Sequence, residues 1–144
     1  MRVLFDTTVL VAWFLEYHPD HATAWSWAGR VQRREVRGIV ALHSLSETWS
    51  VISAFPRSPV PSTESVAAFV LGKVAADLEV VTPSIEDYRD AIGAMALAGI
   101  RGGAIFDALI LQAARKAKAD LVLTFDVKDF RRVAPDLAKR IRSP

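Results

Sequence analysis

The sequence contains no cysteine, and glycine and proline are scarce, at seven residues each among 144. Without cysteine there is no disulfide scaffold, no thiolate zinc site and no cysteine nucleophile, which fits a reducing compartment. The low glycine and proline content, together with 51% hydrophobic and 24% charged residues, excludes collagen-like, low-complexity and disordered chains. The composition is that of an ordinary globular protein.

No hydrophobic run reaches the length of a membrane-spanning helix. The apolar stretch over residues 9–15 ends at Glu16, far short of the roughly 20 residues needed to cross a bilayer. Asp6 also lies where a signal peptide needs uninterrupted apolar residues. We therefore expect no membrane association and a cytoplasmic location, and the length suggests a single domain over residues 1–144.

A strong excess of charge of either sign is also absent. The 18 Lys and Arg residues against 16 Asp and Glu leave a formal net charge of +2, which alone predicts no nucleic-acid partner. Two groups of arginines are still candidates to contact a phosphate backbone, although a solvated face is the simpler explanation for most of them. These residues are Arg30, Arg33, Arg34, Arg37, Arg131, Arg132, Arg140 and Arg142.

Short apolar runs alternate with helical patterns along the chain. The runs over residues 3–5, 39–42, 80–81 and 120–124 predict buried strands. Helices are predicted over residues 9–17, from residue 20 onward, and over 44–55, 63–75, 84–97 and 104–118. This alternation predicts an α/β fold in which a short, mainly parallel central sheet carries helices on both faces.

The helix that starts at Asp20 is predicted to bury Ala22, Trp25, Ala28 and Val31. Trp25 and Trp27 are two positions apart, so they cannot both face the core of one helix. We expect one of these tryptophans to meet a partner chain.

Acidic residues fall where predicted strands end. Asp6 follows the first strand, Asp126 follows the last, and Glu47 lies about one helical turn beyond the second. Asp107 follows the glycines at 102–103, near a helix start whose dipole is expected to keep it ionised. Because ligands of parallel α/β sheets bind outside the carboxyl ends of the strands, we expect these acids to converge.

Converging carboxylates have a chemical consequence. Ionised carboxylates at one edge repel one another, and a divalent cation that prefers oxygen ligands, Mg²⁺ or Mn²⁺, relieves this repulsion. Such ions activate water and stabilise the leaving oxygen in phosphodiester hydrolysis. The pattern therefore points to nucleic acid or a nucleotide as substrate.

Each acid also has a purely structural interpretation. Asp6 could cap the following helix, and Glu47 could be the third position of a capping box led by Ser44. Asp107 interrupts an apolar stretch, where burial of an unpaired charge is costly, and this favours a functional role. Asp126 could serve only the turn in which it lies.

The three histidines are weaker candidates. His18 and His21 flank a turn and are interpreted as a solvent-exposed helix start, with metal binding as the less favoured alternative. His43 precedes Ser44 and could line the same edge as the acids.

The ordered set of these elements resembles the PIN-domain nucleases, most closely the VapC-type toxins of type II (VapBC) toxin–antitoxin systems. The resemblance spans nearly the whole chain and rests on the hydrophobic-Asp-Thr element at 3–10, on Glu47, on Asp107 before the apolar residues 108–110, and on the segment 124–130. It implies a three-layer PIN-like fold and an Mg²⁺- or Mn²⁺-dependent endoribonuclease that cleaves single-stranded RNA. It also implies a cognate antitoxin protein as partner and, usually, a homodimer.

Carried over to this sequence, the resemblance implies Asp6 and Asp107 as the principal metal ligands, with Glu47 and Asp126 completing the set. Relatives often have Asn or Ser where this sequence has Thr8, and Asn where it has Asp126, with the later acid kept as Asp129. We favour Asp126 as the fourth acid because it lies nearer the strand end. Three threonines are expected to donate hydrogen bonds to the acids, and Asp129 to orient Asp126 or hold the turn. The threonines are Thr7, Thr8 and Thr124.

Other classes of protein share parts of this sequence pattern. An aspartyl-nucleophile phosphatase needs a second Asp two residues after the first, and Thr8 stands there instead. A housekeeping RNA-processing PIN nuclease and a non-catalytic PIN-like RNA-binding scaffold remain open alternatives.

Overall fold

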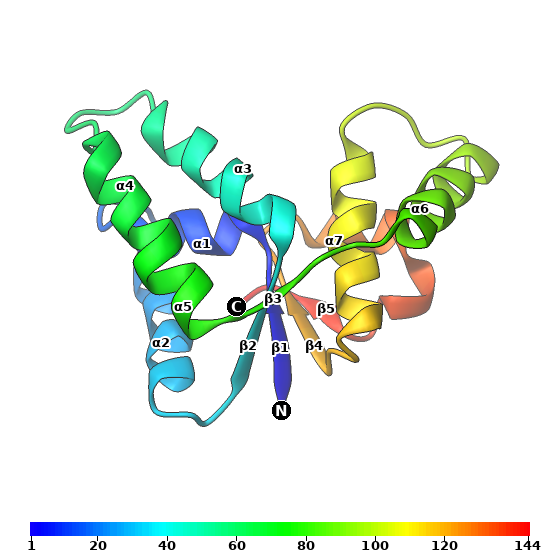
Figure 1. The fold of residues 1–144 in the computed structure, drawn as a ribbon, viewed down its shortest axis with the longest axis horizontal. Coiled ribbons are helices and arrows are strands. Elements are labelled where there is room, and N and C mark those ends of the chain that lie inside the picture. The colour runs from blue at the N-terminus through cyan, green and yellow to red at the C-terminus, as the bar shows by residue number, and fades with distance from the viewer.

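A five-stranded parallel sheet in the order β3-β2-β1-β4-β5 forms the centre of the computed structural model, which describes all residues 1–144 (Figure 1). Each neighbouring pair of strands is parallel, so all the carboxyl ends lie at one edge. The mainly parallel sheet predicted from the sequence is confirmed, and one further strand, β5, was not predicted. The strands are β1 (Arg2–Phe5), β2 (Arg37–Ala41), β3 (Glu79–Val81), β4 (Leu121–Leu123) and β5 (Ile141–Arg142).

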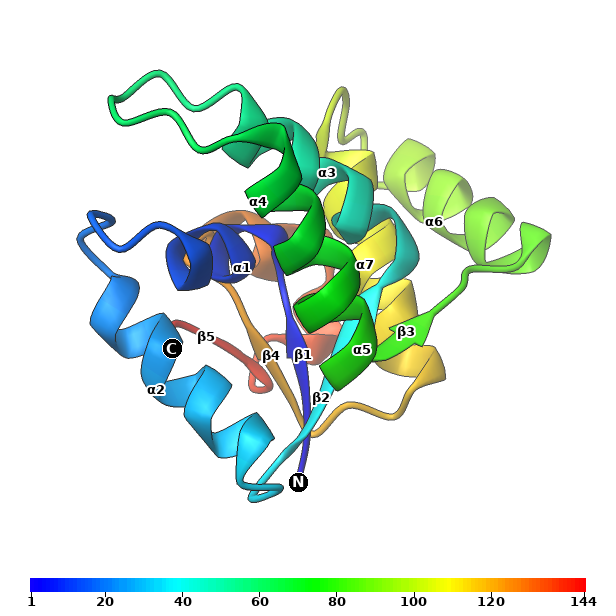
Figure 2. The same cartoon turned by 60° about the vertical axis from the view of Figure 1, so that its left-hand side comes forward.

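Helices cover both faces of the sheet (Figures 1 and 2). On one side lie α1 (Thr7–Phe14), α2 (His21–Gln32), α3 (Leu42–Ser53) and α4 (Thr63–Phe69), which continues through a π-helical segment (Val70–Val74) into α5 (Ala75–Asp77). On the other side lie α6 (Ile85–Leu97), α7 (Ala104–Lys116) and α8 (Val127–Val133), followed by a 3₁₀ turn (Pro135–Leu137). The predicted three-layer α/β architecture is therefore confirmed. None of the helices combines the length and apolar character that a membrane crossing requires.

The hydrophobic core has two layers because strand side chains alternate between the faces of the sheet. In β1, Val3 and Phe5 pack with α1 and α2, whereas Leu4 packs with α7 and α8. All three are fully buried, which explains why the strands are short apolar runs instead of alternating patterns.

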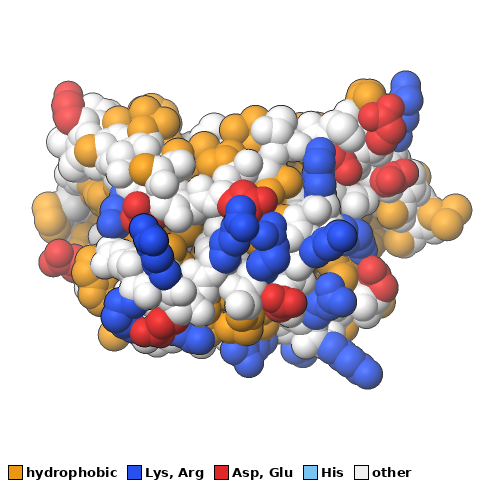
Figure 3. Space-filling model, turned by 60° about the horizontal axis from the view of Figure 1, so that its bottom comes forward, with side chains coloured by type: hydrophobic (Ala, Val, Ile, Leu, Met, Phe, Trp, Pro, Cys, Tyr) orange, Lys and Arg blue, Asp and Glu red, His pale blue; other side chains and the backbone are white.

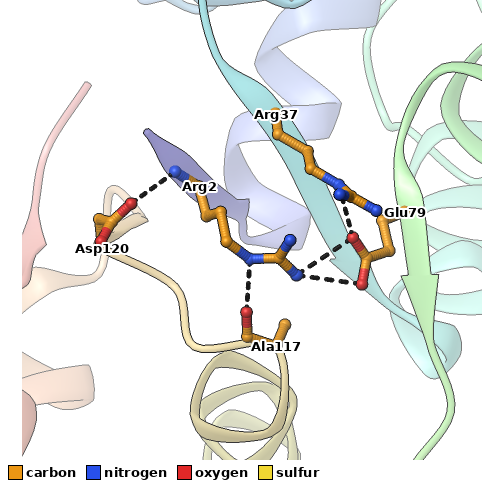
Figure 4. A network of polar contacts seen from close by, with 5 residues as sticks. All are labelled: Arg2, Arg37, Glu79, Ala117 and Asp120. Carbon is orange, nitrogen blue, oxygen red and sulfur yellow. Dashed lines mark hydrogen bonds and ion pairs between the residues drawn. The ribbon is translucent and has the colours of Figure 1, made fainter.

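The amino ends of the strands are tied together by a polar network (Figure 4). Glu79 in β3 accepts from Arg2 Nη2 at 3.1 Å and from Arg37 Nε at 2.9 Å, which joins three strands. Arg2 also donates from Nε to the carbonyl of Ala117 at 2.6 Å, and from its backbone N–H to Asp120 at 2.7 Å. These contacts hold the amino edge of the sheet together.

The start of α3 differs from the prediction. The helix begins at Leu42 with Ala41 as its cap, because β2 passes into it without an intervening loop. Ser44 is fully buried and its hydroxyl has no hydrogen-bond partner, so the predicted capping box with Glu47 is wrong. A capping box is present at another helix, α6, where Ser84 and Asp87 form it.

The buried face of α2 also differs from the prediction. Trp27 is 8% exposed and lies in the core, whereas Trp25 is 54% exposed. The inference that the two tryptophans cannot share one face is confirmed, but the choice of Trp25 for the core is wrong. Asp20 is the N-cap of α2, as predicted, and the buried stripe consists of Ala24, Trp27, Ala28 and Val31.

Candidate active site

A cleft of about 280 Å³ opens at the carboxyl edge of the sheet and brings together all four predicted acids. Asp6 follows β1, and Asp126 comes three residues after β4 ends. Glu47 reaches the cleft from α3, and Asp107 from the first turn of α7. Four segments that are far apart in the sequence therefore contribute one carboxylate each.

Asp6 is buried at 3% exposure and caps α1, so its structural interpretation is correct as well. Its Oδ2 accepts hydrogen bonds from the hydroxyls of Thr8 at 2.6 Å and Thr124 at 2.8 Å. Its Oδ1 receives none, which leaves this atom available to a ligand. Burial raises the pKa of Asp6, and the hydrogen bonds from the two threonines act against this rise.

The hydroxyls of Thr8 and Thr124 each accept a backbone N–H, and this fixes the direction in which each donates its own proton. Thr8 Oγ1 accepts the backbone N–H of Phe125 at 3.1 Å, and Thr124 Oγ1 accepts that of Asp126 at 3.0 Å. A hydroxyl that accepts one hydrogen bond directs its own proton elsewhere, here to Asp6. The threonines thus connect Asp6 to the turn that carries Asp126.

Glu47 is held from α1 instead of by a helix cap. The Thr7 hydroxyl donates a 2.6 Å hydrogen bond to Oε2 of Glu47, and Oε1 receives no hydrogen bond. As predicted for Thr7, Thr8 and Thr124, each hydroxyl therefore donates to an acid of the cleft.

Asp107 has no hydrogen bond or ion pair of its own, and burial is the largest cause that raises its pKa to about 7. The negative charges of Asp6, Glu47, Asp126 and Asp129 contribute in the same direction. The expectation that the helix dipole keeps Asp107 ionised is therefore wrong, because burial and neighbouring carboxylates outweigh the dipole.

Asp126 and Asp129 are distinguished by the structure. Asp126 lines the cleft, whereas Asp129 is about half exposed and pairs with Arg132 at 3.3 Å. The partner of Asp129 is thus a residue of its own helix, and the expectation that it orients Asp126 is wrong. The placement favours Asp126 as the fourth acid.

The donor set fits a hard divalent cation. Two carboxylates keep one free oxygen each, Asp107 has no partner, and no Lys or Arg lines the cleft to neutralise them. A cation bound among these oxygens would remove the repulsion that raises the pKa of Asp107. As the side chains stand, no three Asp, Glu or His residues are close enough to enclose an ion, so binding requires some of them to rotate.

His18 is a cleft residue that the sequence interpretation assigned to solvent. It lines the cleft, and its ring stacks on Phe125 with centroids 6.2 Å apart. Its Nδ1 accepts the backbone N–H of Asp20 at 3.1 Å. His21, three residues later, lies outside the cleft, with Nδ1 2.9 Å from the Ala12 carbonyl and its ring against Trp25.

None of the arginines suggested as phosphate contacts lines the cleft. Arg33, Arg34 and Arg37 lie between α2 and β2, at the amino end of the sheet, and basic side chains gather over that end of the molecule (Figure 3). Arg30 and Arg33 pair with Glu35, and Arg131 donates to backbone carbonyls. The solvated or structural interpretation therefore describes these arginines better.

Comparison with known proteins identifies the family. Residues 3–135 match the family model of the PIN domain. The chain belongs to the PIN-domain family. This PIN domain is 30% identical over 118 residues to ribonuclease VapC27 of Mycobacterium tuberculosis, a match that covers 81% of this chain and 79% of the relative. The predicted family is thereby confirmed.

Solved structures similar to this PIN domain include toxins and toxin–antitoxin complexes. The VapC20 toxin of Mycobacterium tuberculosis, described as cleaving the sarcin-ricin loop, has a TM-score of 0.70 and 20% identity, covering 92% of this chain and 95% of that one. VapBC2 of Rickettsia felis, bound to a promoter DNA fragment, has a TM-score of 0.68 and 16% identity, covering 100% and 99%. FitAcB of Neisseria gonorrhoeae has a TM-score of 0.63 and 13% identity, covering 91% and 92%. At these identities the likeness shows the shared fold.

Proposed function

We propose that this PIN domain is an Mg²⁺- or Mn²⁺-dependent endoribonuclease that cleaves single-stranded RNA as the toxin of a VapBC-type system. The observation that carries the proposal is the convergence of four carboxylates, without a cationic side chain, in one cleft. The relationship to ribonuclease VapC27 supports RNA as the substrate class.

Asp6, Glu47, Asp107 and Asp126 would hold one or two divalent ions in this proposal. A bound divalent ion supplies an activated water and neutralises charge that develops on the phosphate oxygens. Thr8 and Thr124 hold Oδ2 of Asp6 so that Oδ1 faces a ligand, and Thr7 does the same for Glu47. Asp107, whose pKa is raised to about 7 by burial and by neighbouring carboxylates, would have to lose its proton to serve as a ligand of such an ion.

RNA cleavage by single-acid variants tests this proposal. We expect Asp6→Asn and Asp107→Asn to lose at least about 100-fold in kcat on a labelled single-stranded RNA with Mn²⁺, and a chelator to abolish wild-type cleavage. Asp129→Asn is the matched control, because it removes a nearby carboxylate outside the cleft and should keep wild-type activity. Full cleavage by Asp107→Asn would overturn the assignment, and RNA binding without cleavage by the wild type would indicate a non-catalytic scaffold.

We also propose a cognate antitoxin protein as partner, a cytoplasmic location and a homodimer. The antitoxin is supported by the similarity to VapBC2 and FitAcB. The homodimer is supported by apolar side chains exposed along α6, where Ile85, Ile92 and Leu97 are each more than half exposed. Light scattering of the purified chain, alone and co-expressed with the product of the neighbouring gene, tests both interactions.

A further inference from the structure

Two histidine–phenylalanine pairs lie on opposite sides of the acids. In the sheet, β2 and β4 flank β1, so residues that follow these strands lie on either side of Asp6. His43 follows β2 and its ring lies near that of Phe106, while Phe125 follows β4 and stacks with His18. Each phenylalanine directly precedes a cleft acid, since Phe106 comes before Asp107 and Phe125 before Asp126.

The His43–Phe106 pair borders a second hollow of about 370 Å³ that continues the acidic cleft. Glu47 and Val51 line both cavities, so an occupant of one extends directly into the other. Phe106 is 52% exposed although it is a large aromatic side chain, and its ring is tilted by 45° from that of His43. One face of an aromatic ring is thus left without a packing partner beside a proposed metal ligand.

The ring of His43 lines this hollow beside that of Phe106. Both of its ring nitrogens are shielded from solvent and have no hydrogen-bond partner. Ser50 also lines the hollow, and its hydroxyl makes no hydrogen bond within the protein. The Ser50 side chain is exposed, so its hydroxyl is free to meet an occupant of the hollow.

The His18–Phe125 pair lies inside the acidic cleft itself. The two rings are stacked with an interplanar angle of 29°, so a further flat group can continue the stack in the cleft that both residues line. Because Nδ1 of His18 accepts the Asp20 N–H, the proton of the neutral ring is on Nε2, which makes no hydrogen bond within the protein.

The chemistry of these positions favours nucleobases as occupants. No Lys or Arg lines either cavity, so a substrate cannot be held there by neutralisation of its phosphates by side chains. Bases are flat and uncharged, and unpaired bases of single-stranded RNA stack on Phe and His rings.

We propose that the His43–Phe106 hollow and the His18–Phe125 pair bind the two nucleobases that flank the scissile phosphate. This inference rests on the proposed function, because it requires RNA in the cleft. It assigns substrate positioning to aromatic stacking on both sides of the acids, and it makes the base edge that faces Ser50 a source of sequence preference.

Abasic RNA substrates test the inference. The cleavage site of the wild-type chain is first mapped on a single-stranded oligonucleotide with Mn²⁺, and the base on either side of that site is then removed. We expect each abasic substrate to lower the wild-type kcat/KM about tenfold, mainly through KM. Phe106→Ala should show the same loss on intact RNA, with no further loss on one of the abasic substrates. His18→Ala should behave in the same way toward the abasic substrate on the other side.

Matched variants keep the result interpretable. Phe106→Trp should retain stacking and wild-type KM, while His21→Ala removes a histidine outside the cleft and should leave cleavage unchanged. If removal of either base lowered the kcat/KM of Phe106→Ala further and by the same factor, the inference would be overturned. The nuclease function would remain intact. Cleavage of intact RNA by Phe106→Ala at the wild-type rate would also overturn the inference, even if this substitution weakened the binding of a protein partner. A wild-type chain that cleaves no RNA would overturn the proposed function itself.

Discussion

The Thr8 hydroxyl donates a 2.6 Å hydrogen bond to Oδ2 of Asp6 while accepting the Phe125 backbone N–H at 3.1 Å. One side chain of α1 thereby fixes both the deepest carboxylate of the cleft and the turn that follows β4. Together with Thr124, it determines which oxygen of Asp6 remains free. Two threonine hydroxyls thus determine which oxygen of Asp6 is free to bind a ligand.

Replacement of Thr8 by Val should weaken both stability and metal binding. The substitution keeps the shape but leaves the Asp6 oxygen and the Phe125 N–H without this partner, at a cost of about 1–3 kcal/mol. Urea denaturation and Mn²⁺ titration measure the two effects. Thr8→Ser retains the hydroxyl and serves as control, and a Thr8→Val protein as stable as the wild type would contradict this account of Asp6.

The metal-free protein should lose stability as the pH rises from about 4 to 7. The native state keeps the Asp107 proton up to about pH 7, whereas the unfolded chain releases it near 3.8. Between these values the native state binds more protons, so the free energy of unfolding falls with rising pH. Asp6, whose pKa is raised by burial, contributes in the same direction.

Denaturation of Asp107→Asn in the presence of a chelator isolates this contribution. We expect the variant to exceed the wild type in stability by about 1–2 kcal/mol at pH 8, since the open cleft screens part of the repulsion, and to show a flatter pH profile. Asp129→Asn should keep most of the wild-type slope, because Asp129 is the smallest of the named causes that raise the pKa of Asp107 and is paired with Arg132. If the free energy of unfolding of Asp107→Asn fell with pH as steeply as that of the wild type, the raised pKa described for Asp107 would be refuted.

Ser44→Ala distinguishes a buried hydroxyl from a helix cap by the sign of its effect. Ser44 is fully buried without a hydrogen-bond partner, so its replacement should leave stability unchanged or raise it by about 0.5–1 kcal/mol. If Ser44 capped α3, the same change would cost about 1 kcal/mol. Thermal denaturation with Ser84→Ala, which does remove a cap, provides the comparison.

Glu79→Gln should destabilise the sheet without changing the site. The substitution removes the charge that pairs with both Arg2 and Arg37 at the amino edge, and we expect a loss of about 1 kcal/mol that shrinks in high salt. Cleavage of RNA and Mn²⁺ affinity should stay at wild-type values, because the network lies at the opposite edge from the cleft (Figure 4). A marked loss of activity would show that the two edges are coupled.

The sequence predicts the carboxylates better than their surroundings. Asp6 and Asp126 follow apolar runs, and the geometry of a parallel sheet brings strand ends together, so their convergence is predictable from local pattern alone. The pKa of Asp107 is not, because it is raised first by burial in the folded protein and then by carboxylates from three distant segments, which together outweigh the local helix dipole. The position of His18 likewise depends on Phe125, more than 100 residues later.

The predicted start of α3 is wrong because a local sequence signal competed with the way β2 connects to the helix. Ser44 and Glu47 have the spacing of a capping box, but β2 enters α3 directly and leaves no room for a cap at Ser44. Strand β5 has two residues, Ile141 and Arg142, which is too short for a periodic signal. It forms because β4 offers an unpaired edge with which it aligns in parallel.

Titration of Mn²⁺ into the chelator-treated protein tests most directly whether the four carboxylates form one cation site. We predict saturable binding by the wild type and by Asp129→Asn, accompanied by proton release near pH 7 as Asp107 ionises. Asp6→Asn and Asp107→Asn should lose this binding while remaining folded. Binding of Mn²⁺ by Asp107→Asn with wild-type affinity, or no binding by the wild type, would contradict the account.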